Sequence, residues 1–202
     1  MKLHKYLEQA LGNKISISVL RVLVNHKGKI FTIRRLAEDA DASHPEVSAT
    51  VEELEKFGIV QIQPVGRAHQ VSLNEKSYVL QEIVKPILKA EEKTLDKVIL
   101  ILKNHLGTKK ITSAAIFGSV SRGEEKEDSD IDVLIISDDF EYASMLISNA
   151  GQEIFLKLHN KVAPIIFSES EFKSKKKKND FIRSILDNHI MIYGKNLKNL
   201  LE

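Results

Sequence analysis

The chain has 202 residues, of which 43% are hydrophobic and 29% are charged, and its formal net charge is +2. This composition is typical of a globular protein, and the chain is long enough for one large or two small domains. The absence of cysteine excludes a disulfide framework and a cysteine-based zinc site, and the lack of a long apolar stretch indicates a cytoplasmic protein without membrane contact.

The N-terminal part of the chain predicts helices. Apolar residues recur at helical spacing over residues 15–25, and the Asn-His-Lys-Gly run that follows marks the end of that helix. Thr32 can cap a second helix over residues 33–39. Ser43 and Glu46 have the spacing of a capping box, which predicts a third helix close behind the second. Three short helices in succession favour a helix-turn-helix.

A β-hairpin follows the third helix. Residues 59–73 alternate apolar and polar side chains around the pair Gly66-Arg67, as in two strands joined by a tight turn. Three helices followed by a hairpin resemble the winged-helix fold, and the run Leu-Glu-Lys-Phe-Gly-Ile-Val over 54–60 looks like its helix-to-wing junction. We therefore predict a winged-helix domain over residues 1–75.

The winged-helix resemblance makes DNA a candidate partner. In such folds the third helix enters the major groove and the wing touches the DNA backbone. Candidate DNA contacts on the outer face of the third helix and at the wing tip are His44, Ser48, Thr50 and Arg67. The same helix also carries carboxylates, which phosphates repel, at Glu46, Glu52, Glu53 and Glu55. Protein contacts or dimerisation are therefore the alternative role for this domain.

A connector is expected over residues 76–110. Apolar residues at helical spacing from Leu80 to Leu106 indicate a long amphipathic helix with a start or kink at Pro86, because proline lacks the N–H donor. Its regularly spaced lysines are typical of a solvated face, and the helix could also form the seam of a homodimer.

A motif of candidate metal-binding and phosphate-binding residues begins after the connector. A short apolar run over residues 114–117 ends in Gly118-Ser119, and a second apolar run opens with Asp130 and Asp132. Alternating side chains of a strand would place both carboxylates on one face, where they suit Mg²⁺ or Mn²⁺. Glycine lets the backbone approach a phosphate, which predicts a site for a nucleoside triphosphate and a metal ion.

This motif resembles the signature of the nucleotidyltransferase superfamily that includes DNA polymerase beta. The matching residues are Gly118-Ser119, then ten further residues, then Asp130-Ile131-Asp132. Arg122-Gly123 and Ser129 resemble its small, stand-alone members. The resemblance covers residues 111–194. It implies that Asp130 and Asp132 are catalytic metal ligands and that Gly118, Ser119 and Arg122 bind the nucleotide. Arg122 could instead tether the loop through ion pairs with the glutamates that follow it.

The remaining elements predict an α/β domain with a mixed sheet over residues 111–202. We expect a helix over 142–158, a strand over 162–167, a helix over 172–189 and a last strand over 190–193. The lysine-rich run 173–178 is typical of a solvated helix start, and could also attract an acidic partner. The whole chain is thus predicted as a winged helix and a nucleotidyltransferase domain joined by a long helix.

The strand over 162–167 departs from the pattern that the resemblance implies. Active members of the superfamily carry a third carboxylate there, which completes a two-metal site. By alignment that position falls on Ala163, and its neighbours Val162 and Pro164 are also uncharged. The two remaining aspartates could still hold the metal ion that accompanies a triphosphate.

Three functions stay open from the sequence. The first is transfer of a nucleoside monophosphate to an unknown hydroxyl acceptor, with a protein acceptor such as a toxin implied by antitoxin members of the superfamily. The second is a winged-helix DNA-binding transcriptional regulator whose degenerate transferase domain senses nucleotide. The third is an interaction module without either activity.

Overall fold

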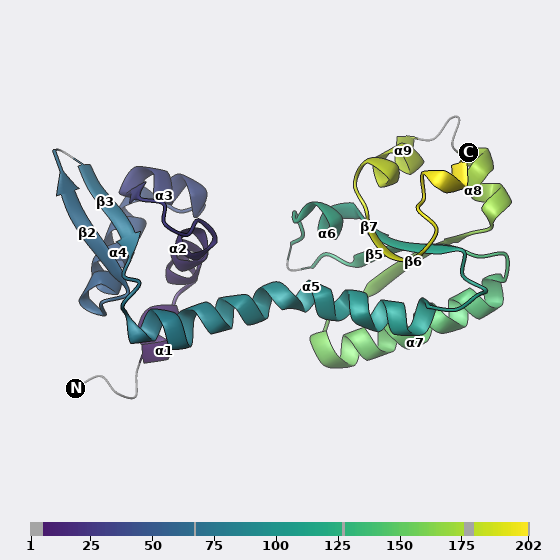
Figure 1. Ribbon diagram of the computed structural model, residues 1–202, viewed down its shortest axis with the longest axis horizontal. Helices are drawn as coiled ribbons and strands as arrows, with labels where there is room; N and C mark the ends of the chain where they lie inside the picture. The colour runs from purple at the N-terminus through teal and green to yellow at the C-terminus, as the bar shows by residue number, and fades with distance from the viewer. Residues whose placement is uncertain (1–5, 67, 127, 176–179, 202) are drawn as a thin grey trace. The chain divides into compact units, whose positions relative to one another are not determined.

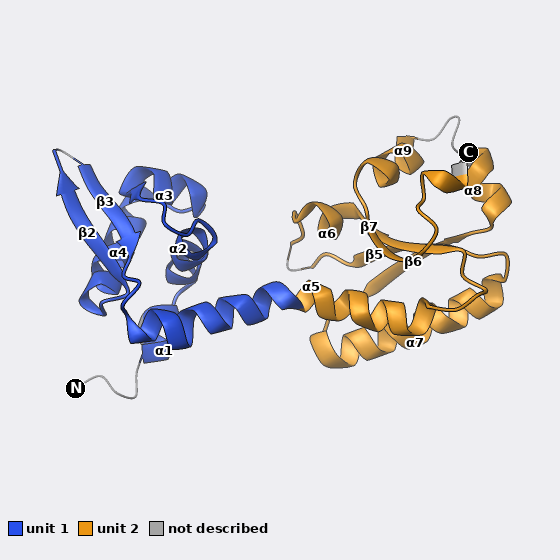
Figure 2. Cartoon of the chain, viewed as in Figure 1, with its two compact units in different colours: residues 1–93 blue, residues 94–202 orange. Residues whose placement is uncertain are grey.

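The computed structural model describes residues 6–66, 68–126, 128–175 and 180–201, and the chain forms two compact units. Figure 2 shows the first unit, Met1–Lys93, in blue and the second, Thr94–Glu202, in orange. Each unit encloses its own hydrophobic core. Over the described ranges, no helix is long and apolar enough to cross a membrane.

The first unit holds the helices α1 (Tyr6–Leu11), α2 (Lys14–Asn25), α3 (Ile33–Asp39) and α4 (His44–Lys56), and the last two begin where the sequence places their caps. Thr32 Oγ1 accepts a hydrogen bond of 3.2 Å from the amide of Arg35 at the start of α3. The amide of Ser43 donates to the Glu46 carboxylate over 3.1 Å, which confirms the predicted capping box. Helix α1 was not predicted.

A small antiparallel sheet completes the winged helix. Its strands are β1 (Phe31–Thr32), β2 (Val60–Val65) and β3 (Ala68–Leu73), in the order β1-β3-β2. Val65 pairs with Ala68, so the predicted hairpin has a two-residue turn whose first residue, Gly66, has φ +59°. The second turn residue, Arg67, lies outside the described residues.

The helical run that contains Pro86 begins before it. The run starts at Tyr78, and a π-helical turn, η1 (Leu80–Val84), leads into α5 (Lys85–Leu106), so Pro86 is the second residue of α5. The Lys85 amide donates to the Leu80 carbonyl oxygen, five residues back, so the departure from α-helical hydrogen bonding lies directly before the proline, which has no N–H to donate. The first turns of α5 belong to the first unit and the rest to the second.

The second unit is built on a mixed four-stranded sheet in the order β6-β5-β4-β7. Its elements after α5 are β4 (Ser113–Phe117), α6 (Gly118–Arg122), β5 (Ile131–Ile136), α7 (Phe140–Leu158), β6 (Val162–Phe167), α8 (Glu169–Lys175), α9 (Asp180–Asp187), β7 (Ile190–Gly194) and η2 (Asn199–Leu201). Strand β4 is antiparallel to β5 and β7, and β5 is parallel to β6. The predicted α/β fold with a mixed sheet is confirmed.

Helices cover both faces of this sheet (Figure 1). On one face α5 and α7 pack against Ile131, Val133 and Ile135 of β5. On the other face α8, α9 and the C-terminal segment pack against Leu134 and Ile136. Strand β5 is therefore buried on both sides, and its alternating residues belong to different cores.

Two predicted helices differ in their bounds. Helix α7 begins at Phe140, two residues before the expected start, because Asp139 caps it and accepts a hydrogen bond of 3.1 Å from the Tyr142 amide. The helix expected over 172–189 is described as α8 and α9, on either side of residues 176–179, which lie outside the described part.

Candidate functional site

Gly118 forms the sharp junction between β4 and α6. Its φ is +75°, a conformation that residues with a Cβ rarely adopt, and a Cβ built there would collide with Asp132 Oδ2. Glycine is thus required both by the backbone and by the close approach of a carboxylate. The junction brings together the two halves of the sequence motif, which are separated by the α6–β5 loop.

Asp132 lies in β5 on the same sheet face as Leu134 and pairs in register with Phe117 at the end of β4. It is partly buried, and burial is the main cause that raises the pKa of its carboxyl group. The negative charge of Asp130 raises this pKa further, whereas the positive charge of Arg122 lowers it. The pKa of Asp132 therefore depends on a second carboxylate and on a guanidinium as well as on its own burial.

Asp130 is exposed and lies just before the first residue of β5. Strand alternation therefore does not fix its direction, but Asp130 lies two residues before Asp132 and its negative charge raises the pKa of the Asp132 carboxyl group. A divalent cation would relieve their repulsion, and oxygen donors are the ligands that Mg²⁺ prefers. The donor pair fits one such ion with its remaining positions filled by substrate and water. Within the described ranges, no group of three or more acidic or histidine side chains could hold a metal ion.

Ser119 and Arg122 lie on α6, directly after Gly118. Arg122 is partly exposed, and its Nε donates to Glu124 Oε2 over 2.7 Å. The guanidinium is thus close enough to influence Asp132 and is at the same time tethered within the loop. Both roles that the sequence left open for Arg122 are compatible with this position.

Ala163 occupies the position beside Asp132 on the neighbouring strand. The parallel register of β5 and β6 pairs Asp132 with Ala163, as the alignment predicted. Two glutamates further along the chain do not replace the missing carboxylate, because each is held elsewhere. Glu153 contacts His105 and Lys157, and Glu169 contacts Lys173.

A contact that the sequence did not reveal joins α6 to the loop before β7. Ser121 Oγ lies 2.9 Å from the Gly118 carbonyl oxygen and 3.1 Å from that of Asn188. The next residue, His189, has its ring held at the end of α9, where Nδ1 lies 2.9 Å from the Ile185 carbonyl oxygen. Only the position of His189 just before the last strand could have indicated this proximity.

The winged helix brings together only part of the predicted DNA-contact set. His44 is exposed and Ser48 is partly buried, but Thr50 is 6% exposed and packs in the core of the unit. The prediction for Thr50 is wrong because it lies three residues after Val47 and next to Val51, on the buried side of α4. Arg67 lies outside the described residues.

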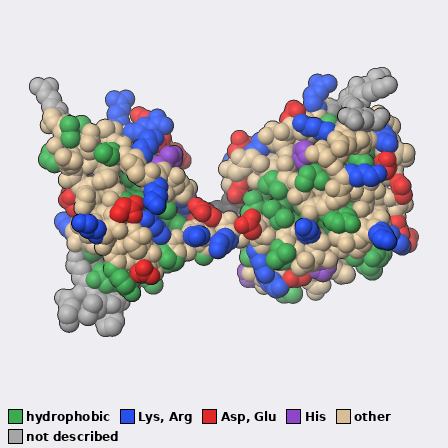
Figure 3. All heavy atoms as spheres, viewed as in Figure 1, with side chains coloured by type: hydrophobic (Ala, Val, Ile, Leu, Met, Phe, Trp, Pro, Cys, Tyr) green, Lys and Arg blue, Asp and Glu red, His purple; other side chains and the backbone are tan. Residues whose placement is uncertain are grey.

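The charges around α4 do not form a basic face. Its exposed carboxylates include Glu52, Glu53 and Glu55, and the last of these accepts a hydrogen bond of 2.8 Å from the Ile62 amide of the wing. On the face of the protein in Figure 3, basic and acidic side chains are interspersed on both units. This pattern does not favour a polyanion such as DNA.

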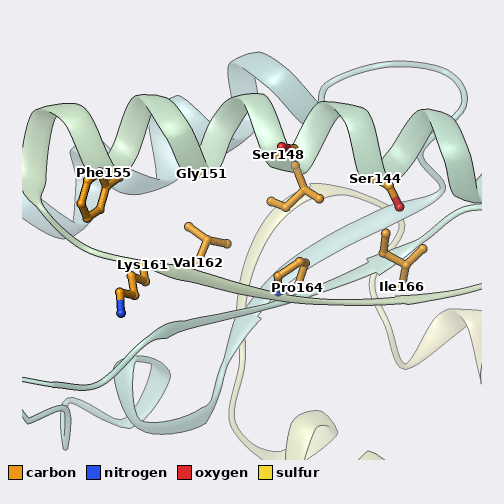
Figure 4. A pocket seen from close by; sticks show the side chains of 9 residues that line it. Ser144, Ser148, Gly151, Phe155, Lys161, Val162, Pro164 and Ile166 are labelled. Atoms are coloured by element: carbon orange, nitrogen blue, oxygen red, sulfur yellow. The ribbon is translucent and has the colours of Figure 1, made fainter.

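A hollow of about 530 Å³ lies on the other side of the second unit's sheet, between α7 and the edge strand β6 (Figure 4). Side chains of Ile147, Val162, Pro164 and Ile166 line it, together with the aromatic ring of Phe155. None of its nine lining residues, all within the described ranges, is acidic. The hollow therefore lacks the carboxylates that would hold a metal ion, and Asp132 and Gly118 lie on the opposite face of the sheet.

Comparisons with known proteins find a family model and curated relatives that match part of the chain. The model of the family described as nucleotidyltransferase domain matches residues 95–192. A "Putative protein adenylyltransferase" of Methanocaldococcus jannaschii is 34% identical over 104 residues, which cover 51% of this chain and 98% of that protein. A second protein of that name and organism is 45% identical over 56 residues, 26% of this chain and 56% of its own length.

Among solved structures, the crystal structure of a toxin-antitoxin with AMP-PNP has a TM-score of 0.35 and 16% identity, and the match covers 52% of this chain and 79% of that one. This likeness is too weak to carry an argument. The first curated relative shows the family of this chain, because almost the whole length of that relative is matched at 34% identity. The chain belongs to the nucleotidyltransferase family and carries a winged-helix unit before its nucleotidyltransferase domain.

Proposed function

We propose that the second unit transfers the nucleoside monophosphate of ATP to a hydroxyl group of a protein, in a reaction that requires Mg²⁺ or Mn²⁺. The contact between the Gly118 junction and Asp132 is the observation that carries this proposal. It supports a site in which a turn suited to phosphate lies beside a carboxylate suited to a metal ion. The names of the curated relatives support adenylyl as the group and protein as the acceptor.

Each site residue then has a chemical role. Asp130 and Asp132 would hold the divalent cation, which supplies Lewis-acid activation of the phosphates and orients them. Gly118 and Ser119 would lie along the phosphates. Arg122 would reach a phosphate oxygen after its ion pair with Glu124 opens, since that ion pair tethers the guanidinium.

The proposed reaction makes one bond and breaks another. The acceptor hydroxyl oxygen bonds to the α-phosphorus, and the bond from that phosphorus to the bridging oxygen breaks. Pyrophosphate leaves with the electron pair, and the hydroxyl proton passes to solvent. Because Ala163 stands beside Asp132, this chain has no carboxylate at that position to receive the proton.

The acceptor is proposed at the level of its class. A protein hydroxyl fits the names of the relatives, and a toxin partner, which the resemblance implies, would be one such acceptor. DNA binding by the winged helix is not part of the proposal, because the exposed face of α4 is rich in carboxylates. The first unit is instead proposed to contact protein.

Transfer of a radioactive label tests this function. Purified full-length protein, Mg²⁺ and ATP labelled at the α-phosphate are incubated with a protein extract. We expect the label on protein and none from ATP labelled at the γ-phosphate, because the γ-phosphate leaves in pyrophosphate. Asp132→Asn should abolish the transfer.

Asp128→Asn is the matched control, since it removes an exposed carboxylate from the same loop without touching the proposed metal pair. It should transfer label like the unchanged protein. Labelling from the γ-phosphate would point to phosphoryl transfer and contradict the proposal. If Asp132→Asn transferred as much label as the unchanged protein, the proposed site would take no part in the reaction.

A further inference from the structure

His189 lies next to the proposed nucleotide site, although it is 57 to 71 positions away from the motif in the sequence. Strand β7 pairs with β4 through Ile116 and Ile190, so the next position along the two strands sets His189 beside Phe117. Phe117 in turn pairs with Asp132. Asp132, Phe117 and His189 therefore lie side by side on three neighbouring strands or their ends, in the order β5, β4 and β7.

The ring of His189 has a fixed orientation. A carbonyl oxygen can only accept a hydrogen bond, so Nδ1, 2.9 Å from the Ile185 oxygen, carries a proton and donates it. Ile185 belongs to α9, which covers the sheet face that bears Phe117. Nε2 has no hydrogen-bond partner within the described part of the chain and remains available to a ligand.

The loop that carries His189 is attached to the Gly118 junction. The Ser121 hydroxyl lies within hydrogen-bond distance of the carbonyl oxygens of both Gly118 and Asn188, which share its one proton, so the residue before His189 is in contact with α6. The Gly118 junction is therefore joined through Ser121 to the segment that leads into β7. Ala163 lies on the other side of Asp132, on β6.

We propose that His189 binds the terminal phosphates of the triphosphate through Nε2; this inference rests on the nucleotide-transfer function proposed above. The imidazolium form donates from both ring nitrogens, one to Ile185 and one to a phosphate oxygen. When the bond at the α-phosphorus breaks, the electron pair and its negative charge move to pyrophosphate. His189 stabilises that charge and takes no proton from the acceptor.

Two substitutions separate this role from a structural one. An asparagine amide can replace Nδ1 and keep the hydrogen bond to Ile185, but it offers nothing at the position of Nε2. A glutamine amide reaches the position of Nε2 instead. His189→Asn should therefore lose the phosphate contact and keep the fold, and His189→Gln should keep much of the phosphate contact.

Calorimetric titration of the full chain with ATP and with AMP, both in the presence of Mg²⁺, provides the test without measuring activity. We expect His189→Asn to weaken ATP binding at least about tenfold, as for loss of a hydrogen bond to a charged group. AMP binding should not change, because AMP lacks the β- and γ-phosphates. His159→Asn is the control. His159 is the exposed C-cap residue of α7 and has a left-handed backbone conformation, which asparagine also tolerates.

The outcomes distinguish this proposal from the proposed function. ATP binding by His189→Asn that equals that of the unchanged protein, or an equal loss of ATP and AMP binding, would overturn the role of His189 and leave the transferase proposal standing. Failure of the unchanged protein to bind either nucleotide would overturn both.

Discussion

At the scale of single residues, the site depends on a glycine and a carboxylate that occupy adjoining space. Gly118 has both a positive φ and an aspartate oxygen where a side chain would be. Asp132 is held partly buried and close to a second negative charge, which disfavours its ionised form. Such arrangements cost the folded protein stability and are expected where a ligand restores the balance.

Gly118→Ala tests the close approach to Asp132. The positive φ alone costs about 1–2 kcal/mol for a residue with a Cβ. Gly123 is the matched control because it has φ +68° and open space around its Cα. Both alanine variants should lose stability in thermal unfolding, Gly118→Ala the more because its Cβ also displaces the Asp132 carboxylate, and only Gly118→Ala should lose binding of Mg²⁺-ATP. Equal nucleotide binding by the two variants would contradict a role for this close approach.

Asp132→Asn should raise the melting temperature at neutral pH by a few degrees while it removes activity. Because burial and Asp130 raise the pKa of Asp132, the ionised carboxylate destabilises the folded protein at pH values above that pKa. The gain should shrink as pH falls and vanish below the unfolded pKa of about 3.9, where aspartate is protonated in both states. Melting curves across this pH range measure it, and a gain that grows with acidity would refute a raised pKa as the cause.

At the scale of elements, the register of β6, β5 and β4 brings the site together. Short apolar runs in the sequence were enough to predict β4, β5 and β6, and the alternation of side chains along a strand predicted the opposite facing of Asp132 and Ile131. The alignment also predicted that Ala163 would stand beside Asp132. These features depend on local periodicity and on a motif of fixed spacing.

Other features depend on contacts between distant segments. The two-residue strand β1 exists only because it pairs with β3, and the approach of His189 to α6 depends on the pairing of β7 with β4. Thr50 illustrates a different limit. Its polar side chain suggested an outward position, yet helical geometry places it beside the buried stripe of α4.

Ala163→Asp tests whether the missing carboxylate limits the reaction. An aspartate at this position would lie beside Asp132 and could receive the acceptor proton. We expect kcat for nucleotide transfer to rise about a hundredfold, the low end of what a positioned general base contributes. Ala163→Asn, which has nearly the same shape without the charge, should show no rise. A rise in both variants would mean that charge is not the cause.

At the scale of the whole molecule, the chain combines a winged helix with a transferase unit, each with its own core. The fold of the first unit alone would suggest DNA binding, because winged helices commonly read a groove. The exposed charges of α4 favour a different use. A fold supplies the scaffold, and the charges of the site decide what is bound.

Charge reversal on α4 tests this interpretation. Glu52→Lys combined with Glu53→Lys should strengthen binding to duplex DNA at low salt at least about tenfold, because repulsion is replaced by attraction. The unchanged protein should bind only weakly in the same gel-shift titration. Glu8→Lys combined with Glu82→Lys makes the same charge change at other exposed positions of the first unit and should have a smaller effect. Nanomolar binding by the unchanged protein, lost on reversal, would show that α4 reads DNA.

The central claim is that Asp130 and Asp132 hold a metal ion for a bound nucleoside triphosphate. Calorimetric titration of the full chain with ATP, with and without Mg²⁺, measures it most directly when it is repeated on the Asp130→Asn/Asp132→Asn variant. We predict binding that requires both the metal ion and the two aspartates. ATP binding that is unchanged in the variant, or the absence of binding by the unchanged protein with Mg²⁺, would contradict the claim.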